Sequence, residues 1–119
     1  MIYTSYYDSE KLDKAIDDGR IVVSISRSEP KWLEVDAKFW QLAPSYDLFN
    51  DSKKGISDEE LEERYFKQLE EKREYVLEIL RFLDKQDAIL CCWCEDYSYC
   101  HRSYLAKWAK KYNFDIKEL

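Results

Sequence analysis

The sequence predicts an α/β fold, a small three-layer sandwich around a mostly parallel sheet of about four strands. Three features carry this prediction. The chain opens with a strand–helix–strand pattern, a long helical stretch without glycine or proline fills its middle, and an apolar run near residue 90 suits burial on both faces. The length of 119 residues fits one domain, residues 1–119.

The N-terminal part has the pattern of a βαβ unit. Ile2–Tyr7 is β-branched and aromatic, which is typical of a strand. A helix with Leu12 on its inner face follows, and Gly19 supplies the left-handed residue that ends it. Ile21–Ile25 is a second β-branched run. Because such units are almost always parallel and right-handed, we expect both strands in one sheet with the helix on its face.

The middle of the chain is predicted to be a long ordered loop followed by helix. Residues 31–55 contain many aromatic and apolar side chains without a sustained period, which indicates a packed loop with no more than a helical turn. Ser57 and Glu60 then form a capping box. Apolar residues recur at helical spacing as far as Leu83, so we expect one long helix or two, with the bend in the charged segment 70–73.

The last part of the chain is predicted to supply the centre of the sheet. Ala88–Trp93 is apolar on both faces, as expected of a central parallel strand. A polar turn leads to Cys100, where a helix begins that carries Leu105 and Trp108 on its apolar face. We expect a short edge strand, Phe114–Ile116, at the end of the fold.

Charge and hydropathy narrow the class of protein. The chain has 19 basic and 25 acidic side chains, a net charge of −6, which disfavours nucleic acid or an anionic membrane as its main partner. The N-terminus lacks the features of a secretory signal and no apolar run is long enough to span a bilayer, so we expect a cytoplasmic protein. In that reducing compartment the four cysteines are expected to be thiols.

The candidate binding residues follow the expected strands. In a parallel α/β sheet, ligands bind beyond the carboxyl ends of the strands, so the segments after the three main strands are expected to meet at one rim. Arginine, hydroxyl and backbone groups there suit a small anionic ligand. The candidate ligand-binding residues are Tyr6, Arg27, Ser28, Cys94, Glu95, Arg102 and Ser103. Aromatic side chains near the rim could also form pocket walls, although such residues are core material more often.

Cys100 and His101 are the candidate catalytic residues. They lie where the polar turn becomes a helix, and the free N–H groups and dipole of a helix N-terminus favour an anion there. The same setting lowers the pKa of a thiol and would make Cys100 a nucleophile or an oxidation-sensitive group. The alternative is that Cys100 is a small buried apolar residue and Arg102 a salt-bridge partner. Arg27 has a similar alternative, an ion pair with one of the many carboxylates.

A metal site is not expected, although the cysteines and His101 are potential zinc ligands. On a strand, Cys91 points away from Cys92 and Cys94, and the chain has only one histidine. Two glycines are too few for a glycine-rich phosphate loop, and no cysteine has an arginine six positions later, as a tyrosine-phosphatase loop requires. The sequence identifies no cofactor and no oligomeric state.

The chain resembles the family named domain of unknown function 488 almost from end to end. The resemblance rests on the opening IYTSYY, on VVSISRSEPKW, on LAPSYDL and on the block ILCCWCEDYSYCHRSYLAKWAKKY. Its most specific parts are RSEP at residues 27–30 and Cys-His-Arg at residues 100–102. The resemblance implies a Rossmann-like or flavodoxin-like sandwich in which Arg27 and the Cys-His-Arg motif lie near each other.

One position departs from the pattern of that family. Relatives commonly have a cysteine, an aromatic residue and a glutamate at the end of the central strand, whereas an ungapped match puts Cys92, Trp93 and Cys94 there. Either Glu95 takes the acidic position through a shift of one residue, or a thiol replaces the carboxylate.

These observations favour a small cytosolic protein that binds a nucleotide or another phosphorylated ligand. Arg27 and Arg102 would hold the anion, and Cys100 or His101 would supply a nucleophile or transfer a proton. One alternative is a non-enzymatic interaction module with an acidic surface, in which Arg27 and the Cys-His-Arg cluster tie loops to the core. Another is redox sensing by the clustered thiols.

Overall fold

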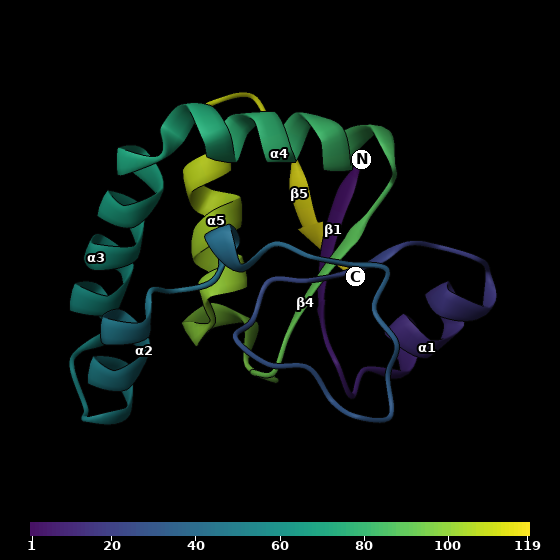
Figure 1. Cartoon of the computed structure of the whole chain (residues 1–119), viewed down its shortest axis with the longest axis horizontal. Coiled ribbons are helices and arrows are strands. Elements are labelled where there is room, and N and C mark those ends of the chain that lie inside the picture. Colours follow the sequence, from purple (N-terminus) through teal and green to yellow (C-terminus); the bar gives the residue numbers. More distant parts are fainter.

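A five-stranded, all-parallel sheet forms the centre of the computed structural model, which describes residues 1–119 (Figure 1). The strand order is β3-β2-β4-β1-β5. The strands are β1 (Ile2–Tyr6), β2 (Val22–Ser24), β3 (Ala37–Lys38), β4 (Ile89–Cys92) and β5 (Ile116–Glu118). The expected Rossmann-like or flavodoxin-like α/β sandwich is confirmed, with five strands where about four were expected.

Helices cover both faces of this sheet. They are α1 (Glu10–Asp17), α2 (Tyr46–Lys53), α3 (Asp58–Glu71), α4 (Arg73–Lys85) and α5 (His101–Lys110), with two short 3₁₀ helices, η1 (Trp40–Leu42) and η2 (Tyr97–Tyr99). α1 lies on one side of the sheet, and α5 and α3 lie on the other (Figure 1). No helix combines the length and the apolar composition needed to cross a bilayer.

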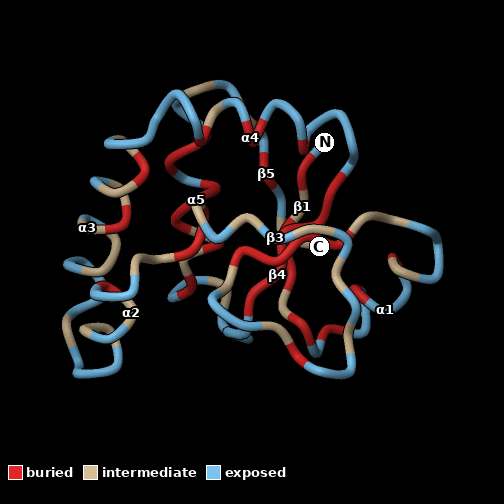
Figure 2. The backbone as a smooth tube through the Cα atoms, in the orientation of Figure 1, coloured by how far each residue is buried: buried red, intermediate tan, exposed pale blue.

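Alternation along β4 divides the core into two apolar clusters. Ile89 and Cys91 pack with Leu12 of α1, whereas Leu90 and Cys92 pack with the helices of the opposite face. All four residues of β4 are buried, and the central strands form the most continuously buried part of the backbone (Figure 2). The prediction of a central strand buried on both faces is therefore confirmed, and Cys91 points away from Cys92 as expected.

The long helical stretch is two helices. α3 ends at Glu71 and α4 begins at Arg73, so the break falls within the charged segment where a bend was expected. Ser57 caps α3, since its Oγ accepts a hydrogen bond from the backbone N–H of Glu60 at 3.1 Å. The predicted helix start is confirmed.

The prediction of a loop with one helical turn at residues 31–55 is wrong. This segment contains β3, η1 and the two-turn helix α2. The start of α2 has a local cause, because the Oγ of Ser45 accepts a hydrogen bond from the backbone N–H of Leu48 at 3.2 Å. The preceding η1 and β3 are too short to produce a hydrophobic period.

The last strand lies two residues later than expected. Asn113 adopts a left-handed conformation with φ of 69°. The backbone N–H of Phe114 donates to the carbonyl of Ala109 at 3.2 Å, which closes the end of α5. Phe114 therefore terminates a helix, and pairing with β1 begins only at Ile116, opposite Ile2.

We expect truncation of the core to be costly in proportion to burial. Leu83 on α4 is 1% exposed, whereas its neighbour Phe82 is 55% exposed. Leu83→Ala should lower the free energy of unfolding by ~2–5 kcal/mol, and the control Phe82→Ala by no more than ~0.5 kcal/mol. Urea denaturation measures both, and equal losses in the two variants would contradict the assignment of faces on α4.

Candidate functional site

The carboxyl ends of three adjacent strands meet at one rim. β4 lies between β2 and β1, so the segments that follow these strands are neighbours. Tyr7 links the segments after β1 and β2. Its hydroxyl donates to the Oγ of Ser24 at 2.9 Å and lies 2.6 Å from the Oγ of Ser26. Trp93, directly after β4, donates from Nε1 to the carbonyl of Ser28 at 2.9 Å and packs edge-on against Tyr7. The rim is therefore held by side chains as well as by the sheet.

A pocket of about 330 Å³, which we call the thiol pocket, opens at this rim. Its walls come from three stretches that are distant in sequence, residues 26–28, 44–61 and 92–101. The residues are Ser26, Arg27, Ser28, Pro44, Phe49, Ser52, Asp58, Leu61, Cys92, Trp93, Cys94, Tyr99 and His101. Of the residues singled out in the sequence, Arg27, Ser28, Cys94 and His101 thus share one pocket.

Arg27 contributes an accessible cation to the thiol pocket. Arg27 is exposed. Its Nε donates to the carbonyl of Pro44 at 2.9 Å, and its guanidinium lies 5.6 Å from the ring centre of Tyr46. No carboxylate forms a salt bridge with it. One edge of the guanidinium is therefore oriented by the protein, and the other donors remain available for an anion.

Three cysteines lie together at the rim, and two of them, Cys92 and Cys94, line the thiol pocket. The Sγ atoms of Cys92 and Cys100 are 2.7 Å apart, and both residues are buried. Cys94 is the exposed member of the group. Cys91 belongs to the opposite face of β4 and takes no part.

The neighbouring thiols and burial shift the pKa values of these three cysteines in different directions. The neighbouring thiols of Cys100 and Cys92 lower the pKa of Cys94. The pKa of Cys92 is raised by its interactions with the thiols of Cys100 and Cys94 and by burial. At Cys100 the hydrogen bond with Cys92 lowers the pKa, but the bond to Cys94 and burial outweigh it and raise the value to about 11. The thiolate belongs on the most exposed sulfur, where desolvation penalises it least.

His101 is neutral at physiological pH. Burial lowers the pKa of its imidazole to about 4, even though the hydrogen bond with the carbonyl of Ile25 raises it. Nε2 lies 2.7 Å from that carbonyl and must be the protonated nitrogen, since a carbonyl only accepts. Nδ1 is then the acceptor, and it lies 3.8 Å from the Sγ of Cys100.

Arg102 does not line the thiol pocket. Its side chain is completely buried, and its Nε and Nη2 donate to both carboxylate oxygens of Glu118 at 3.0 and 2.8 Å. Nη1 donates to the Sγ of Cys92 at 3.2 Å and to the carbonyl of Cys94. The arginine thus joins β4, the turn after β4, and β5. This is the salt-bridge role that the sequence analysis gave as the alternative for Arg102.

The other candidate residues surround this buried arginine or stabilise the turn. The ring of Tyr6 lies 5.8 Å from the guanidinium, and the carbonyl of Glu95 accepts from its Nη2 at 3.4 Å. The hydroxyl of Ser103 donates to the carbonyl of Cys100 at 2.8 Å. None of these side chains lines the thiol pocket, and neither does Cys100, which is 1% exposed.

Several pocket residues escaped the sequence analysis. Phe49, Ser52 and Asp58 come from α2 and from the first turn of α3, which follow no strand of the rim. The sequence around Asp58 predicted the start of a helix but not a place in a pocket. Trp93 had a clearer signal, because it directly follows the central strand.

One group of side chains has the composition of a metal site. The ligand atoms of Cys92, Cys100 and His101 all lie within 4.8 Å of one another. Two thiols and an imidazole are ligands that zinc prefers. Arg102 already supplies a positive charge 3.2 Å from one of these sulfurs, however, which opposes a second cation.

Comparison with known families gives one match. The model of DUF488-N3a, described as the Active DUF488-N3 subclade, matches residues 4–113. No curated protein and no solved structure matches the chain. The match extends from β1 to the turn after α5, so it includes the whole rim and confirms the resemblance found in the sequence.

We expect the buried arginine to depend on its carboxylate partner. Glu118→Ala leaves an uncompensated guanidinium in the core and should lower the free energy of unfolding by about 3 kcal/mol, the lower end for a broken buried pair because Glu118 is 27% exposed. The control Lys117→Ala removes an exposed charge and should change stability by less than ~0.5 kcal/mol. Urea unfolding of both variants tests this, and similar values would show that the pair is not important.

We expect Cys94 to react with iodoacetamide faster than the other three cysteines. Since a lowered pKa keeps the thiolate present as the pH falls, its alkylation rate should hardly change between about pH 8 and pH 6, whereas an ordinary thiol slows roughly tenfold per pH unit. Mass spectrometry of labelled peptides identifies the site. Cys94→Ser should remove the fast reaction and Cys91→Ser should retain it, while a steep pH dependence would mean that Cys94 is a thiol.

Proposed function

The chain belongs to the DUF488-N3a subclade, and we propose that it binds a small anionic ligand, a nucleotide or another phosphorylated compound, in the thiol pocket and acts on it with Cys94 as nucleophile. The observation that carries this proposal is the convergence of Arg27, Cys94 and His101 on one pocket of about 330 Å³. A free cation, a low-pKa thiol and a neutral imidazole are the groups that nucleophilic chemistry on an anion requires. The description of the subclade as active is in keeping with it.

Arg27 would bind the anionic group of the ligand. Its Nε is held by the carbonyl of Pro44, so the free edge of the guanidinium is already oriented and loses little freedom on binding. Phe49, Trp93 and Tyr99 supply apolar walls for the part of the ligand that lies next to Cys94. The ligand is thus expected to combine an anion with an apolar or aromatic part.

Cys94 replaces Cys100 as the proposed nucleophile. Cys100 is buried and protonated, whereas Cys94 is exposed and has a lowered pKa. The Cys94 thiolate would attack an electrophilic atom of the ligand, so that a bond to sulfur forms while the bond to the leaving group breaks and its electron pair departs with that group. Water would then attack the same atom and release the thiolate, with Nδ1 of His101 accepting the proton of the water.

The experiment is a thermal-shift screen of nucleotides and phosphorylated metabolites. A ligand at 100 times its Kd should stabilise the protein by about 2.7 kcal/mol and raise the Tm by several degrees. Arg27→Ala should abolish the shift, Cys94→Ser should retain it, and the control Arg81→Ala, an exposed residue outside the pocket, should leave it unchanged.

Two outcomes would contradict the proposal. The first is that no compound raises the Tm of the unaltered protein. The second is a ligand whose shift survives in Arg27→Ala. A loss of Tm in Arg27→Ala without any ligand effect would instead favour the interaction-module alternative.

A further inference from the structure

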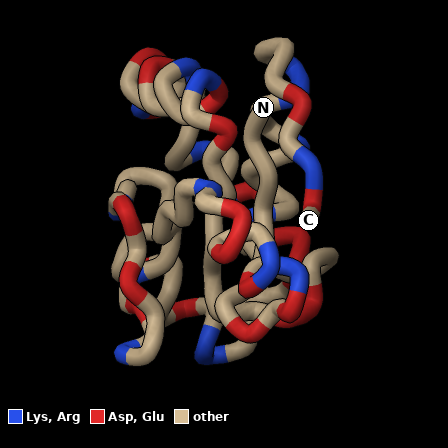
Figure 3. The backbone as a smooth tube through the Cα atoms, turned by 90° about the vertical axis from the view of Figure 1, so that its right-hand side faces the viewer, with Lys and Arg blue, Asp and Glu red and all other residues tan.

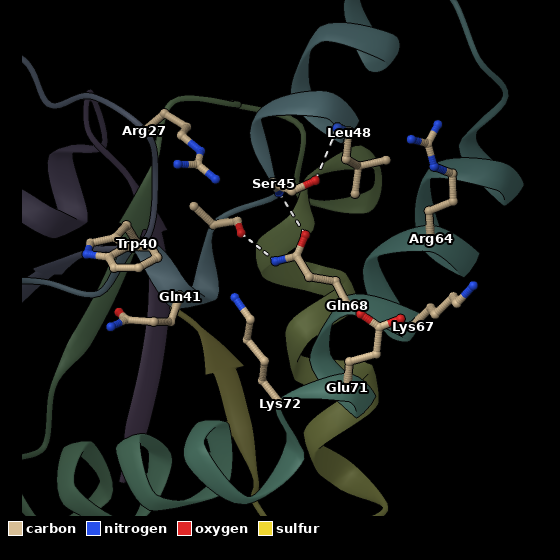
Figure 4. Close-up of a pocket in the computed structure, with 11 residues that line it drawn as sticks. Arg27, Trp40, Gln41, Ser45, Leu48, Arg64, Lys67, Gln68, Glu71 and Lys72 are labelled. Carbon is tan, nitrogen blue, oxygen red and sulfur yellow. Dashed lines mark hydrogen bonds between the residues drawn. The ribbon is translucent and has the colours of Figure 1, made fainter.

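A second depression, which we call the cationic pocket, adjoins the thiol pocket at Arg27, because this residue lines both (Figure 4). It has a volume of about 390 Å³ and lies between the η1–α2 segment and α3. Its charged lining residues are Arg27, Arg64, Lys67, Lys72 and the single carboxylate Glu71. Four cations around one carboxylate are unusual for a chain with a net charge of −6.

Three of these cations have no carboxylate partner. Arg64 is paired with Asp51 at 3.0 Å and with Glu60 at 3.6 Å. Arg27, Lys67 and Lys72 form no salt bridge. Elsewhere acidic and basic residues are interspersed along the chain, as the view turned by 90° shows (Figure 3). Unpaired cations gathered at one concave place attract an anion from solution.

The geometry of the cationic pocket suits a phosphate with a planar group attached. In Figure 4 the guanidinium of Arg27 and the ammonium of Lys72 extend toward the middle of the pocket from opposite ends. The indole of Trp40, which is 57% exposed, forms a wall beside them. An accessible indole offers a face on which a nucleobase stacks, whatever its sequence.

The wall opposite the indole is rigid. The Nε2 of Gln68 donates to the carbonyl of Ala43 at 2.8 Å, and its Oε1 accepts from the backbone N–H of Ser45 at 2.7 Å (Figure 4). Both bonds fasten α3 to the segment that carries Trp40. The pocket is therefore formed before a ligand binds, which lowers the entropy lost on binding.

We propose that the cationic pocket binds a nucleoside monophosphate unit, with its phosphate between Arg27 and Lys72 and its base stacked on Trp40. This inference rests on the proposed function and specifies its ligand: the nucleoside lies in the cationic pocket, and its phosphate reaches the adjoining thiol pocket. Because Arg27 lines both pockets, the phosphate lies at their junction. The bond attacked by Cys94 is then on the phosphate side of the nucleotide, away from the base.

Calorimetric titration with AMP, GMP, CMP and UMP tests the proposal, with adenosine and inorganic phosphate as partial ligands. At least one nucleotide should bind more tightly than phosphate or adenosine. Trp40→Ala and Lys72→Ala should each weaken its binding by roughly 5- to 100-fold, since stacking and a phosphate contact are lost. The matched controls Trp32→Ala and Lys85→Ala remove equally exposed residues outside the pocket and should leave the affinity unchanged.

Protection of Cys94 from alkylation separates this inference from the proposed function. If the nucleotide protects Cys94 in the unaltered protein and higher concentrations are needed in Trp40→Ala and Lys72→Ala, both are supported. Equal protection in all three proteins would overturn the cationic pocket as the binding site and leave the thiol-pocket function standing. Binding that depends on Trp40 and Lys72 but never protects Cys94 would overturn the role of Cys94 in the proposed function. Failure of all four nucleotides to bind at millimolar concentration would overturn the nucleotide proposal, and protection of Cys94 by inorganic phosphate would still support an anion site.

Discussion

The buried guanidinium of Arg102 is the constraint on which the rim depends. A charge without solvent must be fully compensated, and here the compensation comes from the Glu118 carboxylate, the Cys94 carbonyl and the Cys92 sulfur. These partners belong to β5, to the turn after β4, and to β4 itself. The first turn of α5, the edge strand and the turn that carries Cys94 are therefore fixed relative to one another.

Two arginines of the same rim have opposite roles because their burial differs. Arg102 has both edges of its guanidinium occupied by protein groups and is 0% exposed. Arg27 is held only at Nε and at the ring of Tyr46, and it forms no salt bridge. The first joins three segments of the fold, and the second lines both pockets.

The three thiols next to Arg102 behave as one unit. Two of them, Cys92 and Cys100, are buried and have raised pKa values. Cys94 is exposed, and its pKa is lowered by the two neighbouring thiols. In an ungapped match to the cysteine–aromatic–glutamate pattern, Cys94 stands at the position of the glutamate, and a shift of one residue would put Glu95 there. Glu95 is exposed and contributes its backbone carbonyl to Arg102.

Local patterns in the sequence determined the parallel sheet with β4 at its centre, the two helices after Ser57, and the gathering of strand ends at one rim, because apolar period and helix caps act over a few residues. Tertiary structure decided which side chains line the thiol pocket. The side chains of Arg102 and Cys100 are buried, where Glu118 accepts a hydrogen bond from the guanidinium and the sulfur of Cys92 lies next to the thiol of Cys100. No local sequence pattern predicts these contacts. The same applies to Asp58 and Phe49, which reach the thiol pocket from α3 and α2, and to Phe114, which closes α5 instead of opening a strand. Burial and contact between distant segments are properties of the packed chain, and they separate an exposed arginine that lines the pocket from a buried one that joins strands.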